Sequence, residues 1–572
     1  MARYQFVTEE KADGATFTPV ALAQFVAEQI VPLVVARVSD GRALRIVDPA
    51  VGEGILLECL LQELAKNQIK NVTVHGFDTN PESIKKSQSL LQNCFPSLLI
   101  DLRVGDFLEH AAAHVTPSLF LGDDRQECFD VIVANPPYVR TQIMGAVHAQ
   151  RIASRFGLTG RVDLAHAFLL GMNAMLSPDG VAGIIVSNRF MSTRSGSRVR
   201  QVLREAGSVR HIWDLGDTKL FEAAVLPSVL LLEKKTILNS EEAARFTSIY
   251  QTDDSPEHVA ENPIEALRHE GVVELTDTRR FRVRHGKLDV SLDASEVWRI
   301  KTDSSDAWMA AVDECTWGRF GDVGKVRVGV KTCADKVFIR SDWETFAENE
   351  TPELLFPLTT HHVGRSFRAV ESSKKRLIVY PHVNVEGERR VADLSLYPNT
   401  TAYLEKHRVA LEARSYVLEA GRKWYELWVP QDPQQWSRPK LVFRDISERP
   451  TFWIDLEGTI VNGDCYWLTL DAERDIDLLW LAVAVANSSF IEEFYDHRFN
   501  NKLYAGRRRF ITQYVEQFPL PDPSALESRE LVRLAKDLHQ NPERISDRKV
   551  IEKLNDLVYS AFGVSVVEEV CG

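Results

Sequence analysis

The sequence has few cysteines, and their arrangement does not suit a metal site. Seven are spread over 572 residues, none belongs to a C-x-x-C pair, and their number is odd. Structural zinc sites use closely spaced cysteines, and disulfide frameworks use even numbers of them. We therefore expect no metal site, no disulfide bonds and a reducing compartment.

Long apolar runs are also missing. No stretch approaches the roughly 18–20 apolar residues that a membrane-spanning helix needs. The first residues, MARYQF, lack the apolar region that is typical of an export signal. The sequence therefore predicts a cytoplasmic protein that makes no contact with a membrane.

An excess of positive charge is absent as well. Asp and Glu number 81 against 68 Lys and Arg, which gives a formal net charge of −13. This balance argues mildly against a nucleic-acid partner, although a large protein can carry a local basic face. The length exceeds what one hydrophobic core spans, so we expect two to four domains.

The stretch around which the chain is organised is residues 130–138, DVIVANPPY. Its first six residues predict a strand that is buried on both faces. Pro136 and Pro137 end this strand, because neither ring can donate a ladder hydrogen bond. The result is a stiff loop at the carboxyl end of a central strand, which is where open α/β sheets bind their ligands.

Three earlier units of strand, turn and helix place acids at corresponding positions. Strands are predicted at residues 44–48, 72–78 and 98–104, and the acids that end or follow them are Asp48, Asp78 and Asp106. The turn after the first strand, PAVGEG, contains two glycines and precedes a helix. It lacks the three-glycine dinucleotide fingerprint and the Gly-Lys-Ser/Thr of a P-loop, which disfavours NAD and ATP as ligands.

Three further strands are predicted at residues 181–188, 209–215 and 228–233. The last two are too close for a crossover helix, so they must form a hairpin that adds one antiparallel strand. We expect an α/β fold with a seven-stranded, mostly parallel sheet over residues 1–240. A mixed α+β domain would follow over residues 241–572.

Residues 16–233 resemble the catalytic domain of the S-adenosylmethionine-dependent amino-methyltransferases of DNA, in the form typical of the N6-adenine enzymes. The segments that carry the resemblance are Phe17-Thr18-Pro19, residues 48–54, Asp78, residues 105–107 and residues 135–138. Their order is that of the gamma group, which includes the TaqI methyltransferase. The resemblance implies a class I methyltransferase fold, S-adenosyl-L-methionine as cofactor and direct methyl transfer to an adenine flipped out of duplex DNA.

The resemblance also implies residue roles. The Asn135 side-chain oxygen and the Pro136 carbonyl would accept hydrogen bonds from the adenine amino group, while Tyr138 and Phe221 would stack on the base. For the cofactor, Asp78 would bind the ribose, Asp106 the adenine amino group and Phe107 the adenine ring. The methionine end would contact Thr18 and the turn that contains Asp48, Ala50 and Gly52, with either Asp48 or Glu53 at the ammonium group. Asn135 and Pro137 complete the implied cofactor site.

Two basic windows in the second half predict contacts with double-stranded DNA. They are residues 325–340 and 497–509, and Arg, Lys and Asn suit phosphates and base edges. The candidate DNA-binding residues are Lys331, Lys336, Arg498, Lys502, Arg507, Arg508 and Arg509. Residues 328–338, 438–446 and 509–521 resemble the recognition domain of the TaqI-type enzymes.

The favoured interpretation is a site-specific DNA adenine-N6 methyltransferase, the modification enzyme of a restriction–modification system. A restriction endonuclease would be its genetic rather than physical partner. An RNA or protein-glutamine methyltransferase is the first alternative, disfavoured by the long second half and by Phe221. A non-catalytic DNA-binding subunit of a defence complex is the second, disfavoured by the intact motif at Asn135–Tyr138. A fused nuclease is not expected, because residues 1–14 leave no room for one.

Overall fold

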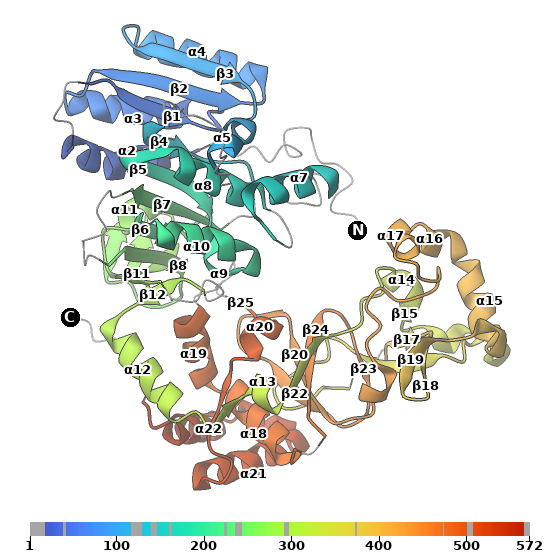
Figure 1. Ribbon diagram of the computed structural model, residues 1–572. Helices are drawn as coiled ribbons and strands as arrows, with labels where there is room; N and C mark the ends of the chain where they lie inside the picture. The colour runs from blue at the N-terminus through green and yellow to red at the C-terminus, as the bar shows by residue number, and fades with distance from the viewer. Residues whose placement is uncertain are drawn as a thin grey trace. The chain divides into compact units, whose positions relative to one another are not determined.

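The computed structural model describes most of the chain in two compact units. The residues described are 18–37, 42–115, 128–138, 146–159, 163–206, 208–221, 226–234, 243–290, 297–371, 375–472, 474–499 and 507–565. Within them the first unit ends at Thr302 and the second begins at Asp303. Figure 1 shows the elements of each unit.

The first unit is built on one large sheet. Its twelve described strands have the order β3-β2-β1-β4-β5-β7-β6-β8-β11-β10-β9, with β12 paired to β11. The first seven are β1 (Leu44–Asp48), β2 (Val72–Asp78), β3 (Leu99–Val104), β4 (Phe129–Ala134), β5 (Leu176–Ser187), β6 (Val209–Asp214) and β7 (Pro227–Glu233). They confirm the seven predicted strands. β1 to β5 form parallel pairs, and β7 runs antiparallel between β5 and β6, as the short connection predicted.

The sheet continues past the predicted domain boundary. The additional strands are β8 (Arg245–Gln251), β9 (His258–Ala260), β10 (Gly271–Leu275), β11 (Arg280–Asp289) and β12 (Arg299–Lys301). β8 pairs in parallel with β6, and its five central residues are buried. The division between the units therefore lies after Thr302 rather than near residue 240. β7 and β8, on either side of the polar sequence at residues 239–242, belong to one sheet.

Helices cover both faces of the sheet, because alternate residues of its strands point to opposite sides. Val131 and Val133 of β4 pack in one apolar cluster with α2 (Val20–Val35) and α3 (Ile55–Lys66). Ile132 and Ala134 pack in another with α5 (Phe107–Val115), α7 (Ala146–Phe156), α8 (Leu164–Met175) and α10 (Ser197–Glu205). α4 (Pro81–Cys94), α9 (Arg189–Ser192) and α11 (Pro263–Ala266) complete the helices described in this unit. The burial on both faces predicted for residues 130–135 is confirmed for residues 130–134, while Asn135 follows the strand and is half-buried.

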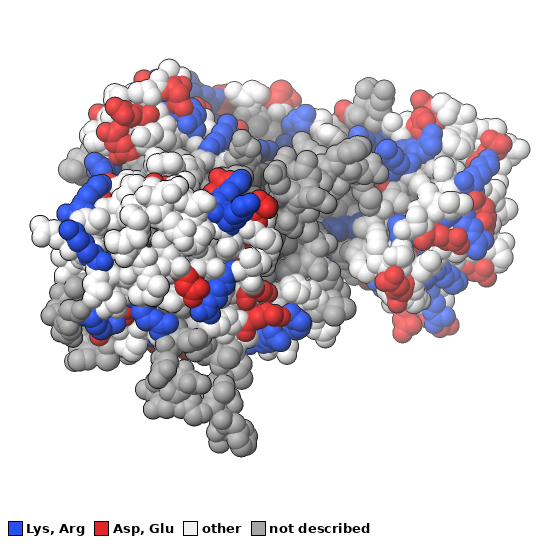
Figure 2. All heavy atoms as spheres, turned by 90° about the horizontal axis from the view of Figure 1, so that it is seen from above, with Lys and Arg blue, Asp and Glu red and all other residues white. Residues whose placement is uncertain are grey.

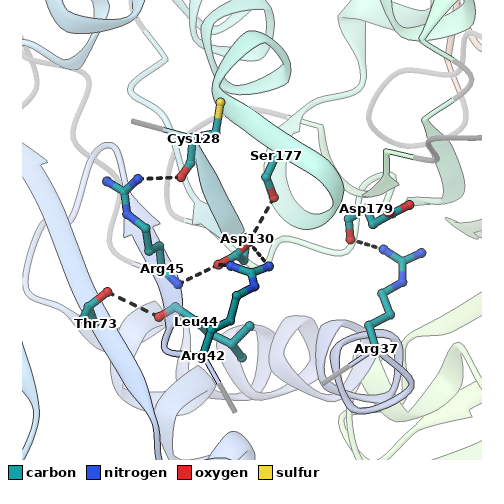
Figure 3. A network of polar contacts seen from close by, with 9 residues as sticks. All are labelled: Arg37, Arg42, Leu44, Arg45, Thr73, Cys128, Asp130, Ser177 and Asp179. Carbon is teal, nitrogen blue, oxygen red and sulfur yellow. Dashed lines mark hydrogen bonds and ion pairs between the residues drawn. The ribbon is translucent and has the colours of Figure 1, made fainter. Parts of the chain in front are cut away.

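A polar network holds the amino end of β4, opposite the end that carries Asn135. Figure 3 shows donors from three segments converging on the Asp130 carboxylate. Arg42 donates through both terminal nitrogens at 2.9 Å, the Arg45 backbone N–H donates at 2.9 Å and the Ser177 hydroxyl at 3.2 Å. A one-residue slip would exchange the two faces of β4, so these bonds to neighbours on β1 and β5 help fix its register.

The second unit combines small sheets with helices, as expected for an α+β domain. One sheet has the order β14 (Gly324–Val328), β24 (Cys465–Leu470), β20 (Lys440–Arg444), β22 (Phe452–Asp455), and another β15 (Ile339–Arg340), β17 (Leu377–Val379), β16 (Leu355–Thr359), β23 (Ile460–Val461). Three two-stranded pairs join β13 (Gly318–Arg319) to β26 (Pro519–Leu520), β18 (His382–Val385) to β19 (Glu388–Val391) and β21 (Ile446–Ser447) to β25 (Arg508–Arg509).

Helices α18 (Asp477–Ala486), α19 (Ser489–Phe499), α21 (Leu526–Gln540) and α22 (Arg548–Ala561) share one apolar core with the first of these sheets. The two α-helices described after residue 524, α21 and α22, thus belong to this core. The other α-helices described in this unit are α12 (Asp303–Glu314), α13 (Phe320–Val323), α14 (Asp335–Phe338), α15 (Pro398–Lys406), α16 (Arg408–Glu412), α17 (Ser415–Glu419) and α20 (Thr512–Val515).

Among the described helices, none combines the length and apolar character needed to cross a membrane. The described His, Cys, Asp and Glu side chains likewise form no cluster that could hold a metal ion.

Candidate active site

The three acids predicted from strand ends lie along one edge of the sheet. Asp48 ends β1, Asp78 ends β2 and Asp106 follows β3. Because β3, β2, β1 and β4 are consecutive parallel neighbours, their carboxyl ends meet at the same edge as Asn135. The sequence therefore placed these side chains on the correct side of the sheet.

Asp48 is a fully buried carboxylate with unused acceptor capacity. Its Oδ1 accepts a hydrogen bond from the Ala50 N–H at 2.9 Å, while the buried Oδ2 has no hydrogen-bond partner among the described residues. Burial raises the pKa of Asp48 to about 8, and the Ala50 N–H opposes this rise. Glu53, the alternative for the ammonium group, is partly exposed and pairs with the Lys86 Nζ at 2.8 Å. A buried carboxylate that lacks a partner suits a cationic ligand group, so the structure favours Asp48.

The glycine turn leaves open space beside Asp78. Gly52 has a φ of +51°, and a Cβ at this position would meet nothing within 4 Å. Its N–H donates to the Asp78 Oδ2 at 2.9 Å, and the Asn80 N–H donates to the Oδ1 at 2.8 Å. Since each carboxylate oxygen can accept more than one hydrogen bond, Asp78 can hold the turn and still receive hydroxyl donors.

Asp106 and Phe107 differ in their surroundings. The Asp106 Oδ1 accepts a hydrogen bond from the Leu108 N–H at 2.8 Å, at the start of α5. Phe107 is 1 % exposed, with its ring centroid 5.8 Å from that of Phe77 and 5.7 Å from that of Phe168. The ring thus packs between Phe77 and Phe168 of α8, and the stacking of Phe107 on an adenine ring stays a prediction.

Asn135 is held by a residue from the start of the described chain. Its Nδ2 donates to the Thr18 Oγ1 at 3.1 Å. Thr18 precedes α2 without capping it, because the N-cap is Pro19, whose carbonyl accepts from the N–H groups of Leu22 and Ala23. Since the amide nitrogen faces Thr18, the buried Asn135 Oδ1 lies on the other side of the side chain. Thr18 thus orients the side chain at the end of β4.

The two aromatic residues predicted to stack on a base lie at the same edge of the sheet. Tyr138 follows β4, and its buried hydroxyl has no hydrogen-bond partner among the described residues. Burial raises the pKa of Tyr138, so the hydroxyl stays protonated. Phe221 lies in the connection from β6 to β7 and is 8 % exposed. β6 is parallel to β4 and β5, so this connection begins at the carboxyl edge. The stacking roles stay predictions.

A buried hydrogen-bond network supports that connection and was missed by the sequence analysis. The Asp214 carboxylate accepts from the Tyr250 hydroxyl at 2.7 Å, the Asn188 Nδ2 at 3.0 Å and the Gly216 N–H at 3.3 Å. These residues lie at the ends of β5, β6 and β8. Burial raises the pKa of Asp214 to about 6, although its hydrogen bonds oppose the rise. Asp214 is a fourth acid at a strand end. This position is the sequence feature that could have predicted the network.

Two of the predicted DNA-binding residues form ion pairs within the second unit. The Arg508 guanidinium is buried and donates to both carboxylate oxygens of Asp496 at 2.8 Å. Arg509 pairs with Asp445 at 3.0 Å. Both arginines belong to β25. The Arg508 side chain is held inside the unit, whereas the Arg509 side chain is 42 % exposed, so its DNA contact stays a prediction.

The remaining candidates differ in exposure. Lys331, Lys336 and Arg507 are exposed, whereas Arg498 is half-buried with its Nη1 3.9 Å from Asp313. Lys502 and Phe17 lie outside the described residues. On the face that Figure 2 shows, basic and acidic side chains are interspersed, and neither sign dominates.

Comparisons with known proteins cover nearly the whole chain. Residues 3–301 match the family model described as N-6 DNA Methylase, and residues 393–520 match the TaqI-like C-terminal specificity domain. The type II methyltransferase M.BanIII of Aneurinibacillus aneurinilyticus is 36% identical over 98% of each chain. The type II methyltransferase M.BstVI of Geobacillus stearothermophilus is 23% identical over 92% of each chain.

Among solved structures, the fold is similar to that of the ATP-dependent Type ISP restriction-modification enzyme LlaBIII bound to DNA. The TM-score is 0.51 at 11% identity, over 92% of this chain and 39% of LlaBIII. At this identity the likeness concerns the fold alone.

Proposed function

Because this chain belongs to the N-6 DNA methylase family, we propose that Asn135, Pro136 and Tyr138 carry out methyl transfer to an adenine N6 atom. The chain is an S-adenosylmethionine-dependent DNA methyltransferase of the type II restriction–modification kind. Double-stranded DNA is its substrate. The residue roles that follow are part of the proposal.

The observation that carries the assignment is the hydrogen bond from Asn135 Nδ2 to Thr18 Oγ1 at 3.1 Å. The exocyclic amine of adenine is a poor nucleophile, because its lone pair is delocalised into the ring. Two acceptors on its N–H bonds localise that lone pair, and the Asn135 oxygen and the Pro136 carbonyl are the acceptors available. Thr18 and the two prolines fix both groups in advance, so they need not reorganise as charge develops.

The residues at the neighbouring strand ends fit the cofactor. S-adenosylmethionine, when bound, supplies a methyl group on a positively charged sulfur. Asp48 would receive its ammonium group, since the Oδ2 is buried and has no described partner. Asp78 would accept from the ribose hydroxyls and Asp106 from the adenine amino group. The open space at Gly52 admits a ligand close to the backbone.

The adenine must leave the duplex to reach Asn135, which costs a few kcal/mol of stacking and pairing. Stacking on aromatic side chains is worth roughly 1–3 kcal/mol per base and offsets that cost. Tyr138 and Phe221 are the two aromatic residues at this edge of the sheet, and we assign them this role.

A modification enzyme protects sites that an endonuclease would otherwise cut. We infer that a restriction endonuclease of the same specificity accompanies this chain genetically, and that the chain acts on the chromosome. No physical complex between the two enzymes is required for protection.

Sequencing DNA from cells that express the chain, with detection of N6-methyladenine, tests the function directly. We expect one modified sequence motif, absent from cells that express the Asn135→Ala variant. That variant should bind S-adenosylmethionine with nearly unchanged affinity by calorimetry. Modified RNA or glutamine with unmodified DNA would contradict the proposal, as would full methylation by the variant.

A further inference from the structure

A short hairpin in the second unit has an unusual backbone conformation. It comprises residues 360–370 between β16 and β17, and we call it the basic hairpin. Val370 N–H donates to the Val363 carbonyl at 2.9 Å, and Gly364 pairs with Ala369. Phe367 near its tip has a φ of +69°, a left-handed conformation that bulky residues rarely adopt. Such outliers persist only where the surroundings enforce them, and they concentrate at functional sites.

The surroundings hold Phe367 firmly. Its side chain is buried in the core that contains Phe452 and Ile454. Its N–H donates to the Phe452 carbonyl at 2.7 Å, and its own carbonyl accepts from the Ile454 N–H at 3.1 Å and from the His539 ring at 2.9 Å. The hairpin is therefore fixed at its tip as well as at its base.

Gly364 brings the hairpin onto an indole ring. A Cβ at this position would lie 2.5 Å from Cζ3 of the buried Trp453, so only glycine permits this approach. The Gly364 carbonyl accepts from Nη1 of Arg365 at 2.8 Å and from Nη2 of Arg444 at 2.6 Å. Two guanidinium groups are thus positioned on the backbone of the hairpin.

The exposed side chains of the hairpin are mostly basic. His362, Arg365 and Arg368 are exposed, while Ser366 is half-buried. His361 pairs with Asp464, and its ring centroid is 3.8 Å from that of His362. The acid that follows the hairpin is Glu371.

Further basic groups adjoin the hairpin. Arg444 binds the Gly364 carbonyl, and exposed Arg376 lies close enough to lower the pKa of His362 together with His361 and Arg444, while Asp464 opposes this. Lys331 is exposed, and a Cβ at Gly463, next to Asp464, would lie 2.8 Å from the Lys331 Cγ. The chain as a whole has a net charge of −13, so the local excess of positive charge at the hairpin is opposite in sign to the net charge of the chain.

We propose that the basic hairpin binds the target DNA duplex, with Arg365 and Arg368 as its contacts to base edges or phosphates. The assignment rests on the proposed function. Arginine is suited to guanine edges and to phosphates, and a backbone fixed in advance needs no ordering when it binds. Lys331, predicted from the sequence as a DNA contact, belongs to the same surface. The hairpin itself lies outside the range that matches the specificity-domain model.

The test compares the full-length Arg365→Gln/Arg368→Gln variant with the wild type. The probes are two 30-base-pair duplexes, one with the motif methylated by the wild type and one with that motif scrambled. We expect binding to the first duplex to weaken by about tenfold or more. Contacts to phosphate would also reduce the slope of log affinity against log salt by about one per lost contact. Affinity for S-adenosylmethionine and the unfolding temperature should not change.

The matched control is Arg548→Gln/Lys549→Gln, which removes the same charge from exposed positions of α22. It should bind both duplexes as the wild type does. The Arg365→Lys/Arg368→Lys variant should retain binding through phosphates but lose preference for the motif if the contacts are to bases. Wild-type affinity and salt dependence in the glutamine variant would overturn the assignment of the hairpin alone. A wild type that methylates no adenine would overturn the proposed function, and the DNA role of the hairpin with it.

Discussion

The side chain that the proposed chemistry depends on most, Asn135, is oriented by a residue 117 positions earlier in the chain. An amide side chain can present either its oxygen or its nitrogen to a ligand. In the structure the Thr18 hydroxyl accepts from the nitrogen, which leaves the oxygen for the proposed contact with adenine. We therefore propose that Thr18 has an orienting role in the reaction.

Replacing Thr18 by valine should lower the rate of transfer at saturating DNA and cofactor by up to about tenfold. The net contribution of a hydrogen bond is about 0.5–1.5 kcal/mol, and the loss of this contribution to fixing the amide corresponds to that change in rate. Thr18→Ser retains the hydroxyl and should keep most of the activity. Single-turnover methylation of a duplex measures the difference, and equal rates for valine and serine variants would rule out the orienting role.

Asp48 should couple cofactor binding to pH. Burial raises its pKa from 3.8 to about 8, so most of the carboxyl group is protonated at neutral pH. A bound ammonium group favours the ionised form, and binding should then release up to one proton at about pH 7. Affinity should rise by up to about tenfold per pH unit from about pH 6 to about pH 8. Calorimetry in two buffers of different ionisation enthalpy measures the proton release, which Asp48→Asn should abolish.

Asp48 also affects the free energy of unfolding of the cofactor-free protein. Here a higher pH is unfavourable, whereas it favours cofactor binding. Because its folded pKa lies above the unfolded value, its contribution is fully present below about pH 4 and is lost as pH rises to about 8. Asp48→Asn should therefore raise the free energy of unfolding of the cofactor-free protein at about pH 8. Denaturant unfolding at about pH 4 and pH 8 would show the gain at the higher pH only.

Single residues were well predicted where local sequence alone determines their place. Asp48, Asp78 and Asp106 end or follow strands, and Asn135 precedes two prolines, so their common edge followed from the topology. The pairing of Asn135 with Thr18 joins distant segments, and no local pattern encodes it. Phe107 shows what local sequence leaves open, because a residue after a strand end can point either to a ligand or into the core, and its ring contacts Phe77 and Phe168.

At the level of elements, β8 stabilises the connection between β6 and β7 by a hydrogen bond. From the sequence alone, the residues of β8 are predicted to belong to the other domain. β8 places Tyr250 beside Asp214, where its hydroxyl donates at 2.7 Å. The connection that begins at Asp214 contains Phe221. β8 is therefore a supporting element of the predicted base-stacking site.

Tyr250→Phe should weaken the capture of the flipped base while leaving cofactor binding unchanged. The buried carboxylate would lose its shortest hydrogen bond, and hydrogen bonds to charged groups contribute about 1.5–3 kcal/mol. We expect a smaller fluorescence increase with 2-aminopurine at the target position, and a higher KM for DNA. The control is Tyr559→Phe, which removes a similar bond, to Glu493 at 2.6 Å, in the second unit. An unchanged fluorescence signal in Tyr250→Phe would contradict this role.

The seven strands of the first sheet were predictable because buried parallel strands are runs of β-branched and apolar residues between helices. The continuation through β8 to β12 was not. A short polar segment at residues 239–242 has the composition of a linker, and backbone pairing between β6 and β8 leaves no mark in either sequence. The many short strands of the second unit, several of two residues, are likewise fixed by long-range pairing rather than by local pattern.

At the level of the whole molecule, the end of the sheet sets where the chain can be divided. A fragment of residues 1–302 keeps every described strand of the large sheet. We expect it to be monomeric, to bind S-adenosylmethionine and to lack site-specific methylation. A fragment of residues 1–240 leaves the edge of β6 unpaired and should aggregate. Light scattering on both fragments measures aggregation, and calorimetry measures S-adenosylmethionine binding. A stable, monomeric fragment of residues 1–240 would argue against the extended sheet as a folding unit.

The division after Thr302 has a consequence for how such enzymes diversify. Among the described residues, no strand pairing of the large sheet crosses it, so recombination there could exchange the sequence-reading unit without disturbing Asn135 or the acids around it. New methylation specificities could then arise in single steps with the same chemistry, and the accompanying endonuclease would have to change specificity with them.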